Sequence, residues 1–149
     1  MRKALILLIA AFVLTACGEE GVWEEVDRAG AEEEEEFILE YISAWEESLE
    51  VQSFSVLEPY YVLNTHGYHT ERRQHQQLVS SRSVEALEEL HSIYPEENEF
   101  GEERVRLEGV FSTTAGGESV EEEQTRYYYL MRKNDEWKID AIGRENQSE

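Results

Sequence analysis

The spacing of apolar residues changes from helical in the first half of the chain to strand-like in the second half. Over residues 37–50 an apolar side chain returns every three or four positions, which predicts a long amphipathic helix. Its apolar stripe consists of Phe37, Ile38, Tyr41, Ile42, Trp45 and Leu49. The apolar residues of 54–63 surround Pro59 and predict a short helix that breaks or restarts at the proline. We expect a turn at 64–67 and a second, more polar helix over about 68–79.

The remaining chain predicts an antiparallel meander. Residues 83–94 fit neither period well, and we expect the end of a helix there, followed by a strand that stops at Pro95. Alternation is clearer beyond this point. The expected elements are a strand over 104–114, a turn at 114–117, a strand over 120–131, a turn at 134–135 and a last strand around 137–141. Helices followed by a meander predict an α+β domain.

The N-terminal residues carry a leader that ends at the only cysteine. A basic start precedes an apolar run over 4–14, which is shorter than the ~20 residues of a spanning helix and is typical of a signal peptide. The letters LTAC at 14–17 resemble the lipobox of bacterial lipoproteins, in which diacylglycerol is attached to the cysteine before the leader is cut off. We therefore expect residues 1–16 to be a lipoprotein signal peptide and Cys17 to be lipidated.

Two alternatives to lipidation stay open: an ordinary secretory leader cut after Ala16, and an uncleaved anchor. Lipidation is favoured because the single cysteine stands where the lipobox requires it. Two or three acyl chains, at roughly 0.8 kcal/mol per buried methylene, hold a protein on a membrane. The chain after Cys17 is then extracytoplasmic and anchored to the cell membrane. ATP and nicotinamide are not available there, and we expect no cofactor, in keeping with a sequence that contains no Gly-rich phosphate loop.

The chain is strongly acidic, with 34 Asp and Glu against 13 Lys and Arg and a formal charge of −21. Such a surface repels phosphate backbones, which excludes sequence-independent nucleic-acid binding as a main activity. The residues after the lipobox are especially acidic, and we interpret 17–34 as the lipidated cysteine and a solvated tether. At ~3.4 Å per extended residue, this tether would lift the domain by about 50 Å. A cation-binding run at Glu32–Glu36 is disfavoured, since adjacent carboxylates on a helix point in different directions.

The rest of the chain is apolar enough for one folded domain. The whole chain is 40% hydrophobic and contains 3 Trp, 8 Tyr and 5 Phe, enough to fill one core. We expect this domain over 35–143 and a polar tail over 144–149.

Three segments of that domain resemble the nuclear transport factor 2-like fold: FILEYISAWEESLE, FSVLEPYYV and the closing YYYLMRKNDEWKIDAI. Within this superfold the chain is most similar to the extracytoplasmic C-terminal domain of the teicoplanin-resistance-associated (TcaA-type) membrane proteins of Gram-positive bacteria. The resemblance spans about Glu35 to Ile142. It implies a cone in which N-terminal helices pack on a curved antiparallel sheet. This chain has a lipobox where that family has a zinc ribbon, a transmembrane helix and extracellular repeats.

The resemblance also implies where a pocket would lie. Enzymes of this superfold act between the long helix and the concave sheet, usually with an Asp-His or Tyr-Asp pair. Side chains that would line such a pocket are Trp45, Tyr60, Tyr61, Phe111, Tyr127 and Tyr129. The aspartates Asp27, Asp135 and Asp140 are expected in the tether, in a turn and on the outer side of a strand. None is placed as an inward base, so we assign no catalytic residue.

Histidines provide a weak metal-binding pattern. His66 and His69 would share a helix face, and with Glu71 they could hold zinc, if a helix continued through Gly67. The glycine argues against that helix, so we expect no metal site.

Together these features predict a non-enzymatic lipoprotein that acts as a binding or accessory module in the cell envelope. Its expected partners are the membrane, through the anchor, and an envelope protein or cell-wall polymer. Arg72, Arg73 and Arg82 form a small basic patch that either pairs with Glu-rich faces or accepts an anionic polymer. The resemblance adds a homodimer formed through the outer face of the sheet. Two hypotheses stay open: binding of a small ligand or cell-wall fragment in the cone pocket, and a hydrolase or isomerase acting there.

Overall fold

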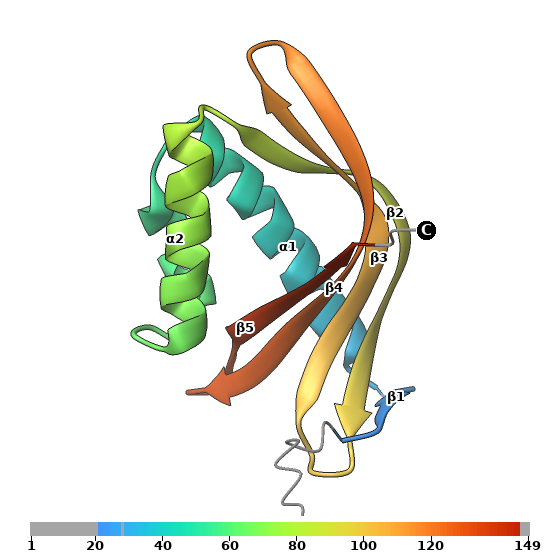
Figure 1. The fold of residues 1–149 in the computed structure, drawn as a ribbon. Coiled ribbons are helices and arrows are strands. Elements are labelled where there is room, and N and C mark those ends of the chain that lie inside the picture. Colours follow the sequence, from blue (N-terminus) through green and yellow to red (C-terminus); the bar gives the residue numbers. More distant parts are fainter. Residues whose placement is uncertain (1–20, 28, 147–149) are drawn as a thin grey trace, which may run out of the picture.

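Three helices lie on one face of a curved, five-stranded antiparallel sheet in the computed structural model, which describes residues 21–27 and 29–146 (Figure 1). The elements are β1 (Trp23–Glu25), α1 (Ala31–Glu50), the 3₁₀ helix η1 (Phe54–Tyr60), α2 (His66–Ser80), β2 (Val84–Asn98), β3 (Glu103–Ala115), β4 (Glu118–Lys133) and β5 (Glu136–Asn146). The strands lie side by side in chain order. The predicted α+β class is therefore confirmed. No helix among the described residues is both long and apolar enough to cross a membrane.

Helix α1 begins at Ala31, earlier than the apolar stripe alone predicts. Gly30 precedes it in the left-handed conformation, with φ 98°. Glutamates occupy the first turn, where the positive end of the helix dipole stabilises them. Part of the acidic segment expected as tether is thus helical, and Glu34 is buried.

The short helix predicted near Pro59 is confirmed as η1, which ends one residue after the proline. Helix α2 begins at His66, inside the expected turn, because the Thr65 hydroxyl caps it by accepting the Tyr68 N–H at 3.1 Å. Gly67 does not interrupt the helix. A Cβ at this position would lie 1.9 Å from the carbonyl oxygen of Asp140, so the glycine lets α2 pack directly on β5.

The helical interpretation of the residues before Pro95 is wrong, because all of Val84–Asn98 is strand β2. Two register shifts against β3, at Leu87/Glu89 and Leu90/Ser92, interrupt the alternation from which a strand is recognised. Pro95 does not end the strand. Its carbonyl accepts the Val26 N–H at 3.0 Å, so this residue's hydrogen-bonding side faces away from β3 and the missing N–H costs no bond to β3.

The meander and both of its predicted turns are confirmed. Strands β3, β4 and β5 pair in sequence. Asn134 and Asp135 adopt φ values of 53° and 61°, and Gly116 and Gly117 adopt 60° and 81°. Two successive positive φ values are the mark of a tight hairpin turn that matches the twist of the strands.

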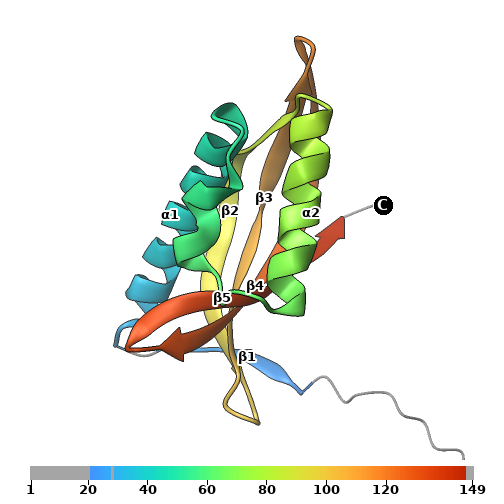
Figure 2. The same cartoon turned by 90° about the vertical axis from the view of Figure 1, so that its left-hand side faces the viewer.

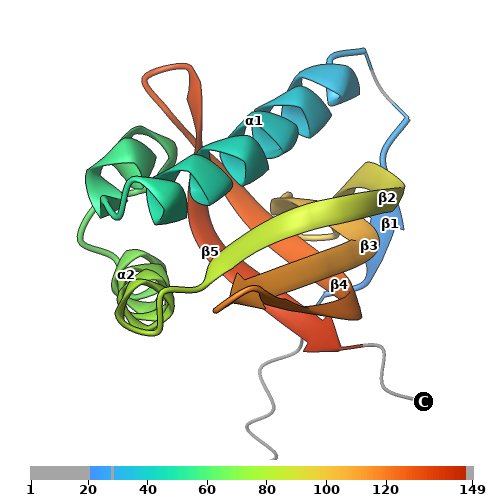
Figure 3. The same ribbon diagram turned by 90° about the horizontal axis from the view of Figure 1, so that it is seen from above.

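The core lies between the helices and the inner face of the sheet (Figures 2 and 3). The predicted stripe of α1 supplies one side, with Ile38 fully buried. Alternate residues of the strands supply the other side, among them Val105, Leu107 and Ile139, which are also fully buried. One face of each element is therefore apolar, as layered packing requires.

Both ends of the domain extend beyond the expected limits. Trp23–Glu25 pairs with β2 in the register Trp23↔Asn98, so the stretch 17–34, interpreted as a tether, contributes a strand as well as the start of α1. At the other end β5 continues to Asn146, into the expected polar tail. The leader and Cys17 lie outside the described residues.

Candidate functional site

The structure does not bring the six aromatic residues of the expected pocket together. Trp45, Tyr61 and Phe111 are buried beneath the helices. Tyr60 is half-buried and packs against Tyr41, with ring centroids 5.7 Å apart.

Tyr127 and Tyr129 lie on the opposite face of the sheet from the helices. Their neighbour Tyr128 points inward, where its ring centroid is 6.0 Å from that of Tyr41 on α1. Because side chains alternate along a strand, the flanking tyrosines must face outward. Three consecutive tyrosines give no sign of which phase the strand adopts, so only the packing against α1 settles it.

Beneath α1 the remaining cavity measures about 10 Å³, which is room for roughly one water molecule. Aromatic and charged side chains fill the rest of this face. Those lining the cavity include Tyr41, Trp45, Glu85, Phe111, Arg126 and Tyr128. A larger ligand could bind there only if a helix moved away from the sheet.

Two ion pairs that sequence analysis missed hold this inner face together. Glu71 of α2 binds Arg144 of β5 through two hydrogen bonds of 2.8 and 2.6 Å. Glu85 of β2 lies 3.0 Å from Arg126 of β4, whose guanidinium carbon is 3.5 Å from the ring centroid of Phe111. Each pair joins residues far apart in the chain. Their only sequence signal is a charged residue at an inward strand position, and recognising that requires the register.

The buried tyrosines and the histidine beneath the helices are held in their neutral forms. The hydroxyls of Tyr41 and Tyr61 hydrogen-bond to each other, and burial raises the pKa of both well above the ordinary value. Burial lowers the pKa of His75, partly opposed by its hydrogen bond to Ser48. The arrangement is that of a packed core. Its two carboxylates in ion pairs, Glu71 and Glu85, are each held by an arginine and are poorly placed to accept a substrate proton.

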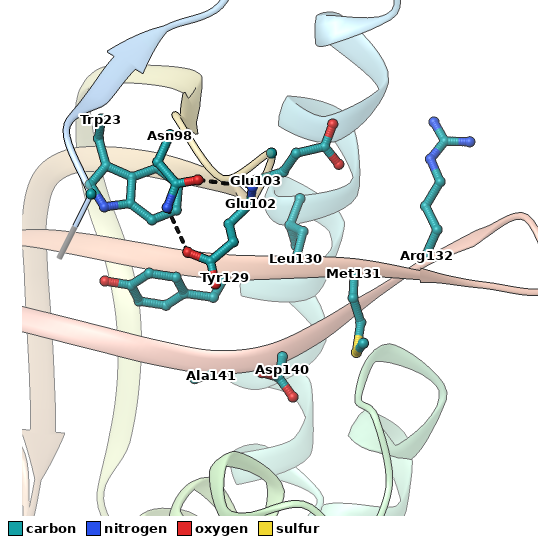
Figure 4. Close-up of a pocket in the computed structure, with 12 residues that line it drawn as sticks. Trp23, Asn98, Glu102, Glu103, Tyr129, Leu130, Met131, Arg132, Asp140 and Ala141 are labelled. Carbon is teal, nitrogen blue, oxygen red and sulfur yellow. Dashed lines mark hydrogen bonds between the residues drawn. The ribbon is translucent and has the colours of Figure 1, made fainter. Parts of the chain in front are cut away.

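A much larger recess, of about 830 Å³, opens where β1, the β2–β3 hairpin, β4 and β5 meet (Figure 4). Figure 4 shows Trp23 and Tyr129 on one side of it, and Met131, Arg132 and Asp140 along β4 and β5. The recess therefore combines aromatic, aliphatic and charged side chains, a mixture typical of binding sites.

The aromatic side of the recess is held together by several contacts. The rings of Trp23 and Tyr129 meet edge to face with centroids 5.8 Å apart. The guanidinium carbon of Arg104 lies 4.1 Å from the Trp23 centroid and 4.2 Å from that of Tyr127, a distance at which cation and ring attract. Glu96 orients this arginine through a 2.8 Å hydrogen bond to its Nε. The recess was missed because Trp23 falls in the segment interpreted as a tether, and a tryptophan in an acidic stretch was its one signal.

The hairpin beside the recess is fixed by one side chain. The Asn98 Oδ1 accepts the backbone N–H groups of Phe100 and Glu102, at 3.1 and 2.9 Å. Its Nδ2 donates to the Glu102 carboxylate at 2.5 Å. The rim of the recess is therefore preformed.

Helix α2 and the turn after it, with the exposed Arg82, carry the remaining candidates. His66 and His69 are exposed on the helix, while Glu71 is turned inward to Arg144. Among the residues that the structure describes, no three His, Cys, Asp or Glu side chains gather closely enough to hold a metal. Arg72 and Arg73 are exposed on the same helix.

No known family model matches the chain. A search of curated proteins also found no match.

Proposed function

We propose that this protein is a non-enzymatic lipoprotein of the cell envelope, a nuclear transport factor 2-like binding or accessory module at the outer face of the cytoplasmic membrane. The proposal rests on the difference in volume between the inner cavity and the recess. The face on which enzymes of the resembled superfold bind substrate is filled, with a cavity of about 10 Å³. The open recess at the β1 end measures about 830 Å³, which is within the usual range for binding sites.

The order of the elements and the curvature of the sheet support the fold assignment. Helices precede an antiparallel meander, and they cover only one face of the sheet (Figure 2). The other face carries Tyr127 and Tyr129, and none of the helices of residues 21–27 and 29–146 lies on it. This is the face through which the proposed homodimer would form.

The pairing of β1 shortens the proposed tether. Only residues 18–20 separate Cys17 from Gly21, the first described residue, which directly precedes Val22 and β1. At ~3.4 Å per residue, the four steps from Cys17 to Gly21 cover at most about 14 Å. A lipidated Cys17 would therefore hold the domain close to the membrane surface, far nearer than the 50 Å expected for a tether ending at residue 34.

The side chains of the recess favour an envelope protein as the partner. Trp, Tyr, Met and Arg are the residue types enriched at protein interfaces, and Trp23, Tyr129, Met131 and Arg132 line the recess. A small ligand or cell-wall fragment is the second candidate. It is favoured by the paired rings of Trp23 and Tyr129 beside Arg132 and Asp140, since such a ligand needs an apolar surface and a few polar groups.

The test is a crosslinking pull-down from native membranes, read by mass spectrometry. We expect the wild-type protein to capture a defined membrane or wall-synthesis protein, and both Cys17→Ala and Met131→Glu to lose it. Val120→Glu is the matched control, because Val120 is also exposed but lies near the opposite end of the sheet. Capture that survives Met131→Glu would exclude the recess as the contact site. Failure of Cys17 to incorporate labelled palmitate would refute the lipoprotein assignment.

A further inference from the structure

The two most exposed large hydrophobic residues of the described chain lie together at one end of the sheet. Val22 is 68% exposed and Phe100 is 64% exposed. Gly21, the residue before Val22, packs against Phe100, since an added Cβ there would lie 3.0 Å from the Phe100 ring. Met131, 44% exposed, lines the same recess as Gly21. We call Val22 and Phe100 the apolar tip; Met131 belongs to the recess beside it.

The packing of the domain does not explain why these side chains are exposed. The core is filled from the inner face of the sheet, and Phe100 stands in the β2–β3 hairpin, where its backbone N–H and that of Glu102 donate to the Asn98 Oδ1. Neighbouring apolar side chains left in water mark a surface that meets a partner or a membrane.

The position of the tip relative to Cys17 indicates which of these it meets. Val22 follows directly on Gly21, at most about 14 Å of chain from Cys17. β1 and the β2–β3 hairpin occupy the same end of the molecule, whereas the β3–β4 hairpin lies at the opposite end (Figure 1). An acyl chain on Cys17 would therefore bring the apolar tip close to the lipid surface and keep the β3–β4 hairpin far from it.

We propose that the apolar tip enters the interfacial layer of the membrane that holds the anchor, so that the domain rests on the lipid with its recess at headgroup level. This inference rests on the proposed lipidation of Cys17. Phenylalanine and aliphatic side chains are well suited to that layer.

The charges around the tip oppose its contact with anionic lipid. The tip is flanked by the exposed carboxylates of Glu24, Glu99 and Glu102, which anionic headgroups repel. The anchor, and not electrostatic attraction, must therefore bring the tip to the membrane. The contact should be closer on phosphatidylcholine than on phosphatidylglycerol, and salt should strengthen it on the anionic lipid by screening the repulsion.

The experiment uses the full lipidated protein, purified from membranes and reconstituted into phosphatidylcholine vesicles with brominated acyl chains. Bromine quenches tryptophan that enters the bilayer. Phe100→Trp reports on the tip, and Val120→Trp is the control at the far hairpin. We expect the emission added by Phe100→Trp to be mostly lost in brominated vesicles and that added by Val120→Trp to be retained.

Flotation of the vesicles distinguishes failure of the tip inference from failure of the lipoprotein assignment. Protein that floats with the vesicles while Phe100→Trp keeps its emission would overturn the tip inference and leave the lipoprotein assignment standing; the tip would then be the contact for a partner protein. Protein that does not float would overturn both. Stronger quenching in phosphatidylglycerol vesicles at low salt would overturn the electrostatic part, since it would show attraction where the carboxylates require repulsion.

Discussion

Arg144 and Glu71 show how much a single buried charge depends on its partner. Burial lowers the pKa of Arg144, but the hydrogen bonds and the charge of Glu71 more than offset this, so that the pKa is raised. The Glu71 side chain is 2% exposed. Replacing one member of such a pair leaves the other charge buried without compensation.

For Glu71→Gln we therefore expect a loss of about 3 kcal/mol in the free energy of unfolding. Urea denaturation followed by circular dichroism measures it. The matched control is Glu136→Gln, which removes the carboxylate 3.4 Å from Lys138. Glu136 is 72% exposed, so its loss should cost less than about 1 kcal/mol. Equal costs for the two variants would mean that the Glu71–Arg144 pair contributes no more than a surface pair.

His75 makes stability depend on pH. It is buried between the rings of Trp45 and Phe54, with centroids 5.5 and 5.2 Å away, and burial lowers its pKa. Below its unfolded pKa, about 6.5, the unfolded chain binds a proton that the folded chain does not. Stability should fall as the pH drops from about 6.5 toward the lowered folded pKa, and this contribution should level off below it.

We expect His75→Gln to flatten the dependence of unfolding free energy on pH between about 7 and 5.5. Urea titrations at several pH values measure the slope, which is independent of any constant loss of stability in the variant. His69→Gln, at an exposed position of the same helix, should keep the wild-type slope. A slope unchanged in His75→Gln would refute the assignment.

At the scale of elements, one glycine determines how closely helix and sheet approach. Helix α2 crosses β5 at Gly67, where a Cβ would lie 1.9 Å from the Asp140 carbonyl oxygen and 3.1 Å from the Ala141 Cα. Both contacts are with backbone, so no side-chain rotation can relieve them. The Glu71–Arg144 pair joins the same two elements.

Gly67→Ala should therefore lower the free energy of unfolding by about 2 kcal/mol, a typical cost of overpacking, although alanine favours helix more than glycine does. Thermal and urea denaturation measure the change. Thr70→Ala, exposed on the same helix, should be nearly neutral. A stabilising effect of Gly67→Ala would mean that helix propensity outweighs the close approach.

At the scale of the whole molecule, repulsion between like charges is the main force against folding that can be inferred from the sequence. The formal charge is −21, and the described ion pairs involve only a few of the carboxylates. Like charges at this density destabilise the compact state, and salt screens them.

Raising NaCl from about 0.01 to 0.5 M should stabilise the domain by roughly 1 kcal/mol, or about 3–5 °C in Tm. Scanning calorimetry measures this. A variant with Glu121→Gln, Glu122→Gln and Glu123→Gln, all exposed on β4, should start from a higher Tm at low salt and gain less from added salt. A Tm that falls with salt would show that attractive pairs outweigh the repulsion.

Part of the site could be inferred from sequence and part could not. The inner positions of Trp45 and Phe111 follow from local patterns, the apolar stripe of α1 and the alternation of β3. The positions of Tyr127, Tyr129 and the recess do not, because their placement depends on which face of β4 meets α1 and on how β1 pairs with β2.

The sequence by itself determined the α+β order, the apolar stripe of the long helix and the two hairpin turns, since periodicity and φ preference act over a few neighbouring residues. It also determined the acidity of the surface. Only the tertiary structure decided that β2 is a strand with two register shifts, that Trp23 belongs to the sheet, and that Glu71 meets Arg144. Each of these rests on a contact between distant segments, whose free energy appears only once the chain has brought them together.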